Sequence, residues 1–252
     1  MFKETRMDEI AKYIAAQSQS TVEELSQHFG VSTMTIRRDL NMLERIGLIS
    51  RTHGGAISSD LLQHEELYEQ KESKNHDAKQ RIAKRALELI KHDSIIFLDA
   101  GTTTYQIALQ IKRNYQGLTI FTNDMKIATE LYDSPNDVFI VGGRIQRETG
   151  SIIGNLTNVF LDALNFDICF IGVQAINQNL YLLTPSEEKA VNKRLLIDKS
   201  PVKVLVCDSS KFDKKGLFNI VSVDVFDYVV TDYEFSDKKT ALLNKGTKIL
   251  KA

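Results

Sequence analysis

The sequence predicts an α/β protein in two parts: a small helical domain at the N-terminus, then a larger, mainly parallel α/β domain. Two observations lead to this fold class. The first 57 residues carry apolar side chains at helical spacing and end in a short, glycine-containing β-ribbon. After about residue 77, near-continuous apolar runs of strand length alternate with helical segments, which is typical of a parallel sheet covered on both faces. We therefore expect domains at 1–57 and 77–252, joined by a polar linker at 58–76 that is partly helical.

Composition and charge exclude several classes of protein. The chain has 252 residues, 26% of them charged and 42% apolar, and its net charge is −1. These values are ordinary for a globular protein, so any affinity for nucleic acid must come from a local patch. Cys169 and Cys207 stand in apolar runs, where buried thiols are expected rather than a disulfide or a zinc site. No apolar stretch approaches the ~20 residues that span a bilayer, and no signal peptide is evident, so we expect a cytoplasmic protein with no membrane partner.

The N-terminal domain is expected to contain two short helices separated by a tight turn. The first begins at Thr21, where Glu24 completes a capping box, and Gly30 ends it. Ser32 caps the second helix. Its inward face is expected to consist of Ile36, Leu40 and Leu43. A helix, a short turn and a second helix form a helix-turn-helix, and the ribbon that turns at 54–55 makes the unit a winged helix.

The second helix of this pair presents a basic, polar face. At about 100° per residue, Arg38 and Asn41 point away from Ile36, and Arg37 flanks them. Arginine binds guanine edges or phosphates through two donors, and N–H groups at a helix start bind phosphate, so this face fits the major groove. A solvated arginine pair on the surface is the alternative. The predicted DNA-binding residues are Ser32, Thr33, Met34, Thr35, Arg37, Arg38, Asn41, Arg51 and His53.

The larger domain is expected to bind a ligand at one edge of its sheet. Strands are predicted over residues 95–99, 118–122, 137–142, 167–172, 203–208 and 227–231. The C-terminal ends of parallel strands share one edge, and polar residues follow five of these strands. Glycine and threonine at 101–104 suit a phosphate, because the backbone approaches closely and free N–H groups begin a helix. Lys211 adds a positive charge. The alternative is an ordinary strand–turn–helix junction with a solvated lysine.

The stretch TVEELSQHFGVSTMTIRRDLNMLERIGLISRTHGGA closely resembles the N-terminal signature of DeoR-type bacterial transcriptional regulators. The core VS-x-x-TIRRDL and the ending R-x-HGGA carry the resemblance, which extends over nearly the whole chain. It implies a repressor of a sugar-catabolic operon. It also implies that the second domain resembles ribose-5-phosphate isomerase and senses a phosphorylated sugar. Neither a metal nor a cofactor is expected.

Motifs of that family support the effector site residue by residue. D-x-GTT is matched from Asp99 to Thr103, and T-N-S is matched at 122–124 with Asp in place of Ser, which adds a negative charge near a proposed anion site. Lys71 and Lys79 match a basic pair at the start of the family's second domain. The predicted effector-binding residues are Asp99, Gly101, Thr102, Thr103, Thr104, Thr122, Asn123, Asp124, Gly142, Gly143 and Lys211.

A sugar-phosphate isomerase with an accessory DNA-binding domain is the rival function. Isomerisation needs a carboxylate base. Where the isomerases have Gly-Ala-Asp-Glu, this chain has GVQA at 172–175, and Lys193 stands opposite their catalytic Glu. We therefore predict a ligand-controlled repressor that is not an enzyme. It would bind operator DNA as a dimer or tetramer, because one such module buries too little surface for high specificity. The linker at 58–76 would couple the two domains. The sugar, the operator and the direction of the ligand's effect stay open.

Overall fold

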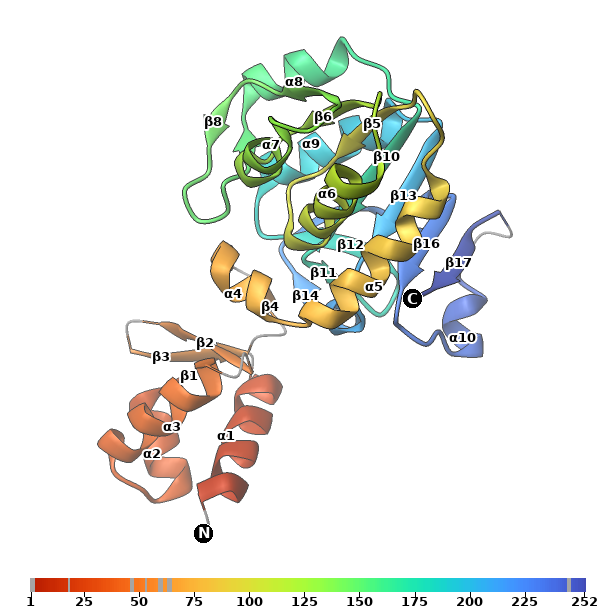
Figure 1. Cartoon of the computed structure of the whole chain (residues 1–252). Coiled ribbons are helices and arrows are strands. Elements are labelled where there is room, and N and C mark those ends of the chain that lie inside the picture. Colours follow the sequence, from red (N-terminus) through yellow and green to blue (C-terminus); the bar gives the residue numbers. More distant parts are fainter. Residues whose placement is uncertain are drawn as a thin grey trace. The chain divides into compact units, whose positions relative to one another are not determined.

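The computed structural model describes residues 3–17, 19–45, 48–52, 54–58, 61–62, 65–243 and 246–252 (Figure 1). The chain divides into two compact units, Met1–Leu62 and Gln63–Ala252. Each unit has a hydrophobic core of its own: Ile10, Leu25, Ile36 and Leu40 belong to the first, and two clusters on opposite faces of a sheet belong to the second. No helix in the described part of the chain combines the length and the apolar character needed to cross a membrane.

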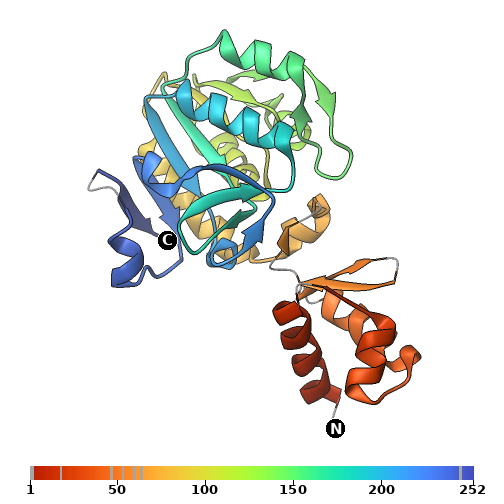
Figure 2. The ribbon, with the colours of Figure 1, turned by 180° about the vertical axis from the view of Figure 1, so that it is seen from behind.

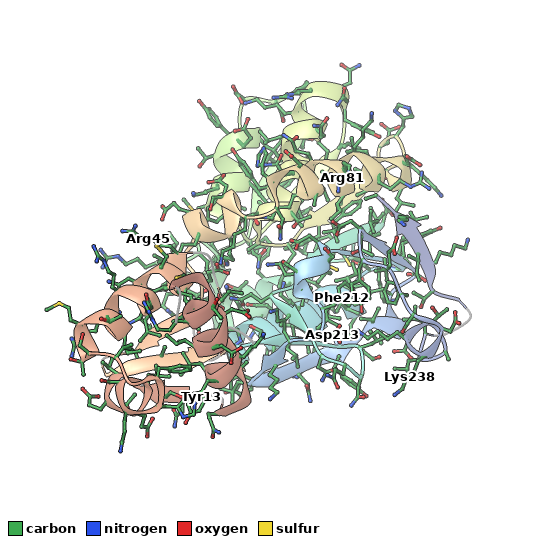
Figure 3. All side chains as sticks on the ribbon, turned by 90° about the horizontal axis from the view of Figure 1, so that it is seen from below. Tyr13, Arg45, Arg81, Phe212, Asp213 and Lys238 are labelled. Carbon is green, nitrogen blue, oxygen red and sulfur yellow. The ribbon has the colours of Figure 1, made fainter. Side chains whose placement is uncertain are left out.

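The first unit consists of three helices and a small antiparallel sheet. The helices are α1 (Lys3–Gln17), α2 (Val22–Phe29) and α3 (Thr33–Arg45), and the strands are β1 (Gln19–Thr21), β2 (Ile49–Thr52) and β3 (Gly55–Ser58). The strand order is β1-β3-β2, so the ribbon predicted from sequence has a third strand. At β1 the chain runs within 2.1 Å of where a Cβ on Gly55 would lie, so the second glycine of the HGGA motif permits close strand approach. Tyr13, labelled in Figure 3, packs against His28 on the outer side of this core.

Local side-chain bonds fix the ends of α2 and the start of α3. Thr21 accepts from the N–H of Glu24 at 3.1 Å, and its own N–H donates to the Glu24 carboxylate at 2.8 Å, so the predicted capping box is confirmed. Gly30 ends α2 with φ +63°, the left-handed conformation that glycine adopts without strain. Ser32 Oγ then accepts from the N–H of Thr35 at 3.2 Å. These caps set the short turn between α2 and α3.

A seven-stranded parallel sheet organises the second unit. Its strands are β5 (Ile95–Leu98), β6 (Thr119–Thr122), β7 (Asp137–Ile140), β10 (Ile168–Gly172), β13 (Val202–Val206), β16 (Tyr228–Thr231) and β17 (Lys248–Lys251). Their order is β17-β16-β13-β10-β5-β6-β7, and each neighbouring pair is parallel. Six of the strands were predicted from apolar runs. The seventh, β17, has the mixed sequence KILK of an exposed edge strand and lacks such a run.

Helices cover both faces of this sheet. Helices α5 (His76–Ala86), α6 (Thr102–Asn114) and α7 (Met125–Leu131) lie in front of it in Figure 1. Helices α8 (Asn155–Asp162) and α9 (Glu187–Asp198) lie in front of it when the unit is seen from behind in Figure 2. Alternate strand residues feed the two cores: Leu98 packs with the α5–α7 side, and Phe97 packs with the other. Cys169 and Cys207 are buried free thiols on that second side, as predicted, and burial raises the pKa of both.

Shorter elements lie around the main sheet. An antiparallel sheet contains β11 (Ala175–Ile176), β12 (Tyr181–Thr184) and β15 (Phe218–Ser222), and a hairpin pairs β8 (Arg144–Ile145) with β9 (Ile152–Ile153). The remaining elements of this unit are α4 (Tyr68–Ser73), β14 (Lys215–Gly216), α10 (Asp237–Thr240) and 3-10 turns at Leu87–Leu89, Ser209–Lys211 and Val223–Val225, and β4 (Leu61–Leu62) ends the first unit. Phe212, labelled in Figure 3, follows the second of these turns and stacks on Tyr233 with the ring centroids 3.8 Å apart.

Candidate nucleic-acid interface and anion pocket

Helix α3 exposes a basic face on the first unit. Arg37, Arg38 and Asn41 are exposed, Met34 is 78% exposed, and Arg45, labelled in Figure 3, is exposed as well. The opposite face of α3 is buried in the first core. Within the part of the chain that the structure describes, neither Arg37 nor Arg38 forms an ion pair through its guanidinium group. Both side chains are therefore available to a polyanion.

Two predicted contact residues bind each other instead of pointing freely outward. Arg51, on strand β2, is half-buried, and its Nη1 donates to the side-chain oxygen of Asn41 and to the backbone oxygen of Arg37. The N–H of Arg51 donates to Glu44 at 2.9 Å. These bonds hold the β-ribbon against α3. A role of Arg51 or Asn41 in contacting DNA stays a prediction.

The other predicted contacts lie at the start of α3 and on the ribbon. Thr33 is exposed, whereas Thr35 is half-buried and its hydroxyl lies 3.0 Å from that of Ser32. The Ser32 hydroxyl is thus already used as a cap. His53 lies outside the described residues.

A buried ion pair that the sequence analysis missed positions α3. Asp39 is 1% exposed, and Arg6 on α1 donates to its carboxylate from Nε at 2.7 Å. A buried carboxylate is stable only when it is paired and hydrogen-bonded. Asp39 stands three residues after the buried Ile36, so helical spacing alone places it on the inward face and indicates that it needs a basic partner.

The strand ends of the second unit form a pocket. The cavity itself is small, with a volume of about 10 Å³, and it opens to solvent. Its lining residues are Asp99, Ala100, Asn123, Ser151, Lys189, Asn192 and Lys193. Two of the predicted effector residues, Asp99 and Asn123, are among them. Gly101 and Asp124 lie directly beside it, since each neighbours a lining residue along the chain.

The glycine–threonine turn after β5 presents unpaired backbone donors. The N–H of Ala100 donates to Asn123 Oδ1 at 2.8 Å, and that of Gly101 donates to Asp124 Oδ2 at 3.2 Å. The next N–H groups, at 102–104, have no partner within the described residues. They begin α6, a helix of 13 residues. Free N–H groups at the start of such a helix attract an anion. Of the three threonine hydroxyls, that of Thr104 already donates to the oxygen of Gly101.

The residues after β6 hold this turn in place. Thr122 Oγ1 donates to the oxygen of Leu98 at 2.7 Å. Asp124 accepts from the N–H groups of Lys126 and Ile127 and so caps α7. Burial raises the pKa of Asp124 to about 6, although its bonds to these N–H groups and to Gly101 act in the opposite direction. Asp124, which replaces the family's serine, therefore caps α7 and holds the glycine–threonine turn after β5 through the N–H of Gly101.

A buried ion pair closes the base of the pocket. Asp99 is 2% exposed, accepts from the N–H of Gly172 at 3.1 Å, and pairs with Lys193. The Lys193 ammonium also donates to the oxygen of Gly172 at 2.7 Å. Lys193 was noted from sequence only as a replacement of a catalytic glutamate. Lys189 and Asn192 were missed altogether, although their spacing from Lys193 on α9 places all three on one helix face.

Further lysines lie near this pocket. Lys79 is 2% exposed and donates to the backbone oxygens of Lys71 and Lys74. Burial, with the charge of Lys211, lowers the pKa of Lys79 to about 8. Burial, with the charges of Lys189 and Lys211, lowers the pKa of Lys71 to about 8. Mutual repulsion of this kind is expected where several cations are gathered to receive an anion.

Three polar side-chain atoms beyond the strand ends have no hydrogen-bond partner within the described residues. They are Gln174 Nε2, Asn192 Oδ1 and Asp208 Oδ2, and each is buried. Gln174 follows β10, Asp208 follows β13, and Asn192 lines the pocket. Buried polar atoms without partners are rare. Each of these atoms is free to form a hydrogen bond with a polar ligand or with water.

The glycine pair after β7 does not line the pocket. Gly142 accepts from Thr157 Oγ1 at 2.9 Å. A Cβ on Gly143, whose φ is +153°, would lie 2.1 Å from the same hydroxyl. The pair is explained by the close approach of α8, so a role of Gly142 or Gly143 in binding an effector stays a prediction.

Comparisons with known proteins agree with both halves of this geometry. A DeoR-like helix-turn-helix domain matches residues 6–61, and the DeoR C terminal sensor domain matches residues 74–233. The HTH-type transcriptional regulator GlpR of Haloferax volcanii is 36% identical over 232 residues, which are 92% of this chain and 91% of that protein. The lactose phosphotransferase system repressor of Lactococcus lactis is 34% identical over the whole length of both chains. Among solved structures, ribose 5-phosphate isomerase A from Methanocaldococcus jannaschii matches 55% of each chain with 17% identity and a TM-score of 0.40.

Proposed function

Because the chain belongs to the DeoR family of transcriptional regulators, we propose that it represses a carbohydrate-utilisation operon under the control of a phosphorylated sugar. A single observation carries the proposal. The same chain combines a helix-turn-helix with unpaired arginines on its exposed face and a lysine-rich pocket beside unpaired N–H donors. In this proposal residues 1–57 bind DNA, residues 77–252 sense the sugar, and residues 58–76 link them.

Helix α3 reads the operator in the major groove. Arg37 and Arg38 supply donors for guanine edges or phosphates, and Thr33 with the first N–H groups of α3 binds the backbone. The chain as a whole carries a net charge of −1, so net charge does not attract it to DNA. Operator DNA is therefore recognised by a local patch in the cytoplasm, at a salt-dependent affinity.

The pocket binds the phosphate and the hydroxyl groups of the effector separately. The unpaired N–H groups of 102–104 and the ammonium of Lys189 suit a phosphate, because they combine a helix start with a positive charge. Asn192 and Gln174 suit sugar hydroxyls, since each has a buried atom without a partner.

Binding without turnover is the function that these side chains favour. The carboxylate of Asp99, which lines the pocket, is fixed by Lys193 and by the N–H of Gly172. A carboxylate that is held by an ammonium group and a backbone N–H is poorly placed to take a proton from a substrate carbon. The rival function, a sugar-phosphate isomerase, predicts conversion of ribose 5-phosphate to its ketose.

A second copy of the chain completes the regulator, because one winged helix reads too little DNA for high specificity. The second unit offers a surface for this pairing beside β7, which is the last strand of the sheet and leaves backbone groups unpaired. Leu156 and Val159 on α8 are 75% and 70% exposed, and Phe139 and Ile145 are also exposed. We call these four residues the apolar edge. Exposed apolar side chains near the edge of a sheet are what such pairing would bury.

Fluorescence-anisotropy titration tests the proposal. DNA fragments selected from a genomic library by the purified protein serve as operators, and a panel of sugar phosphates is added to the complex. At least one sugar phosphate should change the operator affinity by about 5–150-fold, while the corresponding free sugar should not. An operator affinity that every sugar phosphate leaves unchanged, or turnover of ribose 5-phosphate, would contradict it.

A further inference from the structure

The carboxylate of Glu65 is buried in the second unit without satisfying its hydrogen-bonding capacity. Its side chain is 8% exposed, and apart from an ion pair with Lys189 neither carboxylate oxygen has a partner among the described residues. Its charge is compensated by an ion pair, since Lys189 Nζ lies 3.0 Å from Oε1. A buried carboxylate that forms so few bonds is costly to the fold. Its presence therefore needs an explanation other than stability.

Glu65 lies at the positive side of the effector pocket. Its partner Lys189 lines that pocket and also donates to Thr149 Oγ1 at 3.3 Å. Lys71 is near enough for the charge of Glu65 to act on it against the repulsion from Lys189 and Lys211. The surroundings of Glu65 are those that a phosphate group requires: several ammonium groups gathered with little solvent.

The segment that carries Glu65 is held to the second unit over its next residues. The N–H of Tyr68 donates to the oxygen of Glu148 at 3.0 Å, and the Tyr68 ring packs against Tyr105 and lies 3.5 Å below the ammonium of Lys126. Glu66 pairs with Lys74. Glu65 thus lies just ahead of this anchored stretch, and it is three residues after the first unit ends at Leu62.

We propose that Lys189 and Lys71 form an anion subsite which Glu65 occupies from within the chain, and that a phosphate group displaces Glu65 from it. The proposal rests on the proposed function and adds how the pocket communicates with the linker. A dianionic phosphate and a carboxylate repel each other at one poorly solvated site, so the two occupants exclude each other. Phosphate forms more and stronger bonds to ammonium groups than a carboxylate does. Its binding therefore frees the side chain of Glu65, which lies three residues after the first unit ends.

Isothermal titration calorimetry with inorganic phosphate, and then with ribose 5-phosphate, tests this competition. The variant Glu65→Gln removes the charge and keeps the shape, and Glu69→Gln, at an exposed position of α4, is the matched control. Glu65→Gln should bind phosphate about ten-fold more tightly than the unmodified protein, a coupling of ordinary size. The control should stay within about two-fold. Equal or weaker binding by Glu65→Gln would overturn the proposal.

Hydrogen exchange of the unmodified protein gives a second measurement that needs no variant. Saturating phosphate should speed amide exchange in the peptide that spans residues 65–68, and slower or unchanged exchange there would overturn the proposal. The two proposals fail differently. If neither protein binds phosphate or any sugar phosphate, the proposed function fails and this inference fails with it. If both bind a sugar phosphate equally well, only the displacement of Glu65 is refuted.

Discussion

The buried carboxylate of Asp124 makes the stability of the second unit depend on pH. It caps α7 and accepts from the N–H of Gly101 at the anion pocket. Burial raises its pKa from the model-compound value of 3.8 to about 6. The folded protein therefore holds this proton more tightly than the unfolded chain does. Stability contributed by the protonated group is fully present below about pH 4 and is lost as the pH rises through about 6.

The size of this effect follows from the difference in pKa between the two states. About two pKa units correspond to about 3 kcal/mol, at ~1.4 kcal/mol per unit, and about 2 kcal/mol of this appears between pH 4 and pH 7. Serine, the residue that family members carry at position 124, keeps an oxygen for the N–H of Lys126 and has no charge. It loses the bond to Gly101, which costs about 1 kcal/mol at every pH. Between pH 4 and pH 7 the unmodified protein loses about 2 kcal/mol of unfolding free energy that the Asp124→Ser variant keeps, so the stability of the variant relative to the unmodified protein rises by that amount.

Urea unfolding followed by circular dichroism at several pH values measures this difference. Other groups titrate in the same range, but they do so in both proteins and cancel in the comparison. The control is Asp198→Ser, since Asp198 is exposed at the end of α9. If the stability difference between Asp124→Ser and the unmodified protein stays constant from pH 4 to pH 7, the reasoning about a buried, charged cap is refuted.

Four other predictions follow from the site and the surfaces. Arg38→Ala should weaken operator binding by ~1–3 kcal/mol if Arg38 reads a base. If Arg38 contacts only phosphate, binding should weaken equally on all DNA sequences. Anisotropy titrations with operator DNA and with scrambled DNA distinguish the two cases. Thr103→Val, which removes the hydroxyl and keeps the backbone N–H, should keep operator affinity and weaken the response to the sugar phosphate; an unchanged response would show that this hydroxyl does not bind the effector. Leu156→Asp should shift sedimentation toward the monomer whereas Leu242→Asp, another exposed leucine, should not; unchanged sedimentation of both would exclude the apolar edge as the interface. Effector binding at pH 8 should be accompanied by proton uptake, because a bound anion raises the lowered pKa values of Lys71 and Lys79. Calorimetry in buffers of different ionisation enthalpy measures this uptake. The affinity for the effector should fall above about pH 8.

Local signals in the sequence predicted the elements, and non-local contacts decided the rest. Thr21 and Glu24 are three residues apart, so their capping box can be recognised from a short stretch of sequence. The apolar runs of six sheet strands are local signals of the same kind. The strand β1 has only three residues, QST, and exists because Gly55 allows β3 to approach it. The antiparallel sheet around β12 likewise depends on partners distant in sequence. Neither could be read from periodicity.

The same distinction explains which site residues were found. Asp99 and Asn123 follow apolar strands, and the polar punctuation at a strand end points to a shared edge. Lys189 and Asn192 belong to α9, a helix that does not directly follow a strand of the main sheet. Only the folded chain brings them to that edge. Charge partners were hidden for the same reason: Lys193 is 94 residues from Asp99 along the chain.

A pocket whose own charges repel one another is suited to sensing rather than to passive storage of a ligand. Lys71 and Lys79 have pKa values lowered to about 8, so their charged forms are destabilised in the folded protein. Burial is the main cause and repulsion between lysines adds to it, so an entering phosphate stabilises the charged forms in a way that a neutral sugar cannot. The internal carboxylate of Glu65 relieves part of the same repulsion through Lys189. A switch responds only to a difference in affinity between two states, and the proposed displacement of Glu65 by phosphate would supply such a difference.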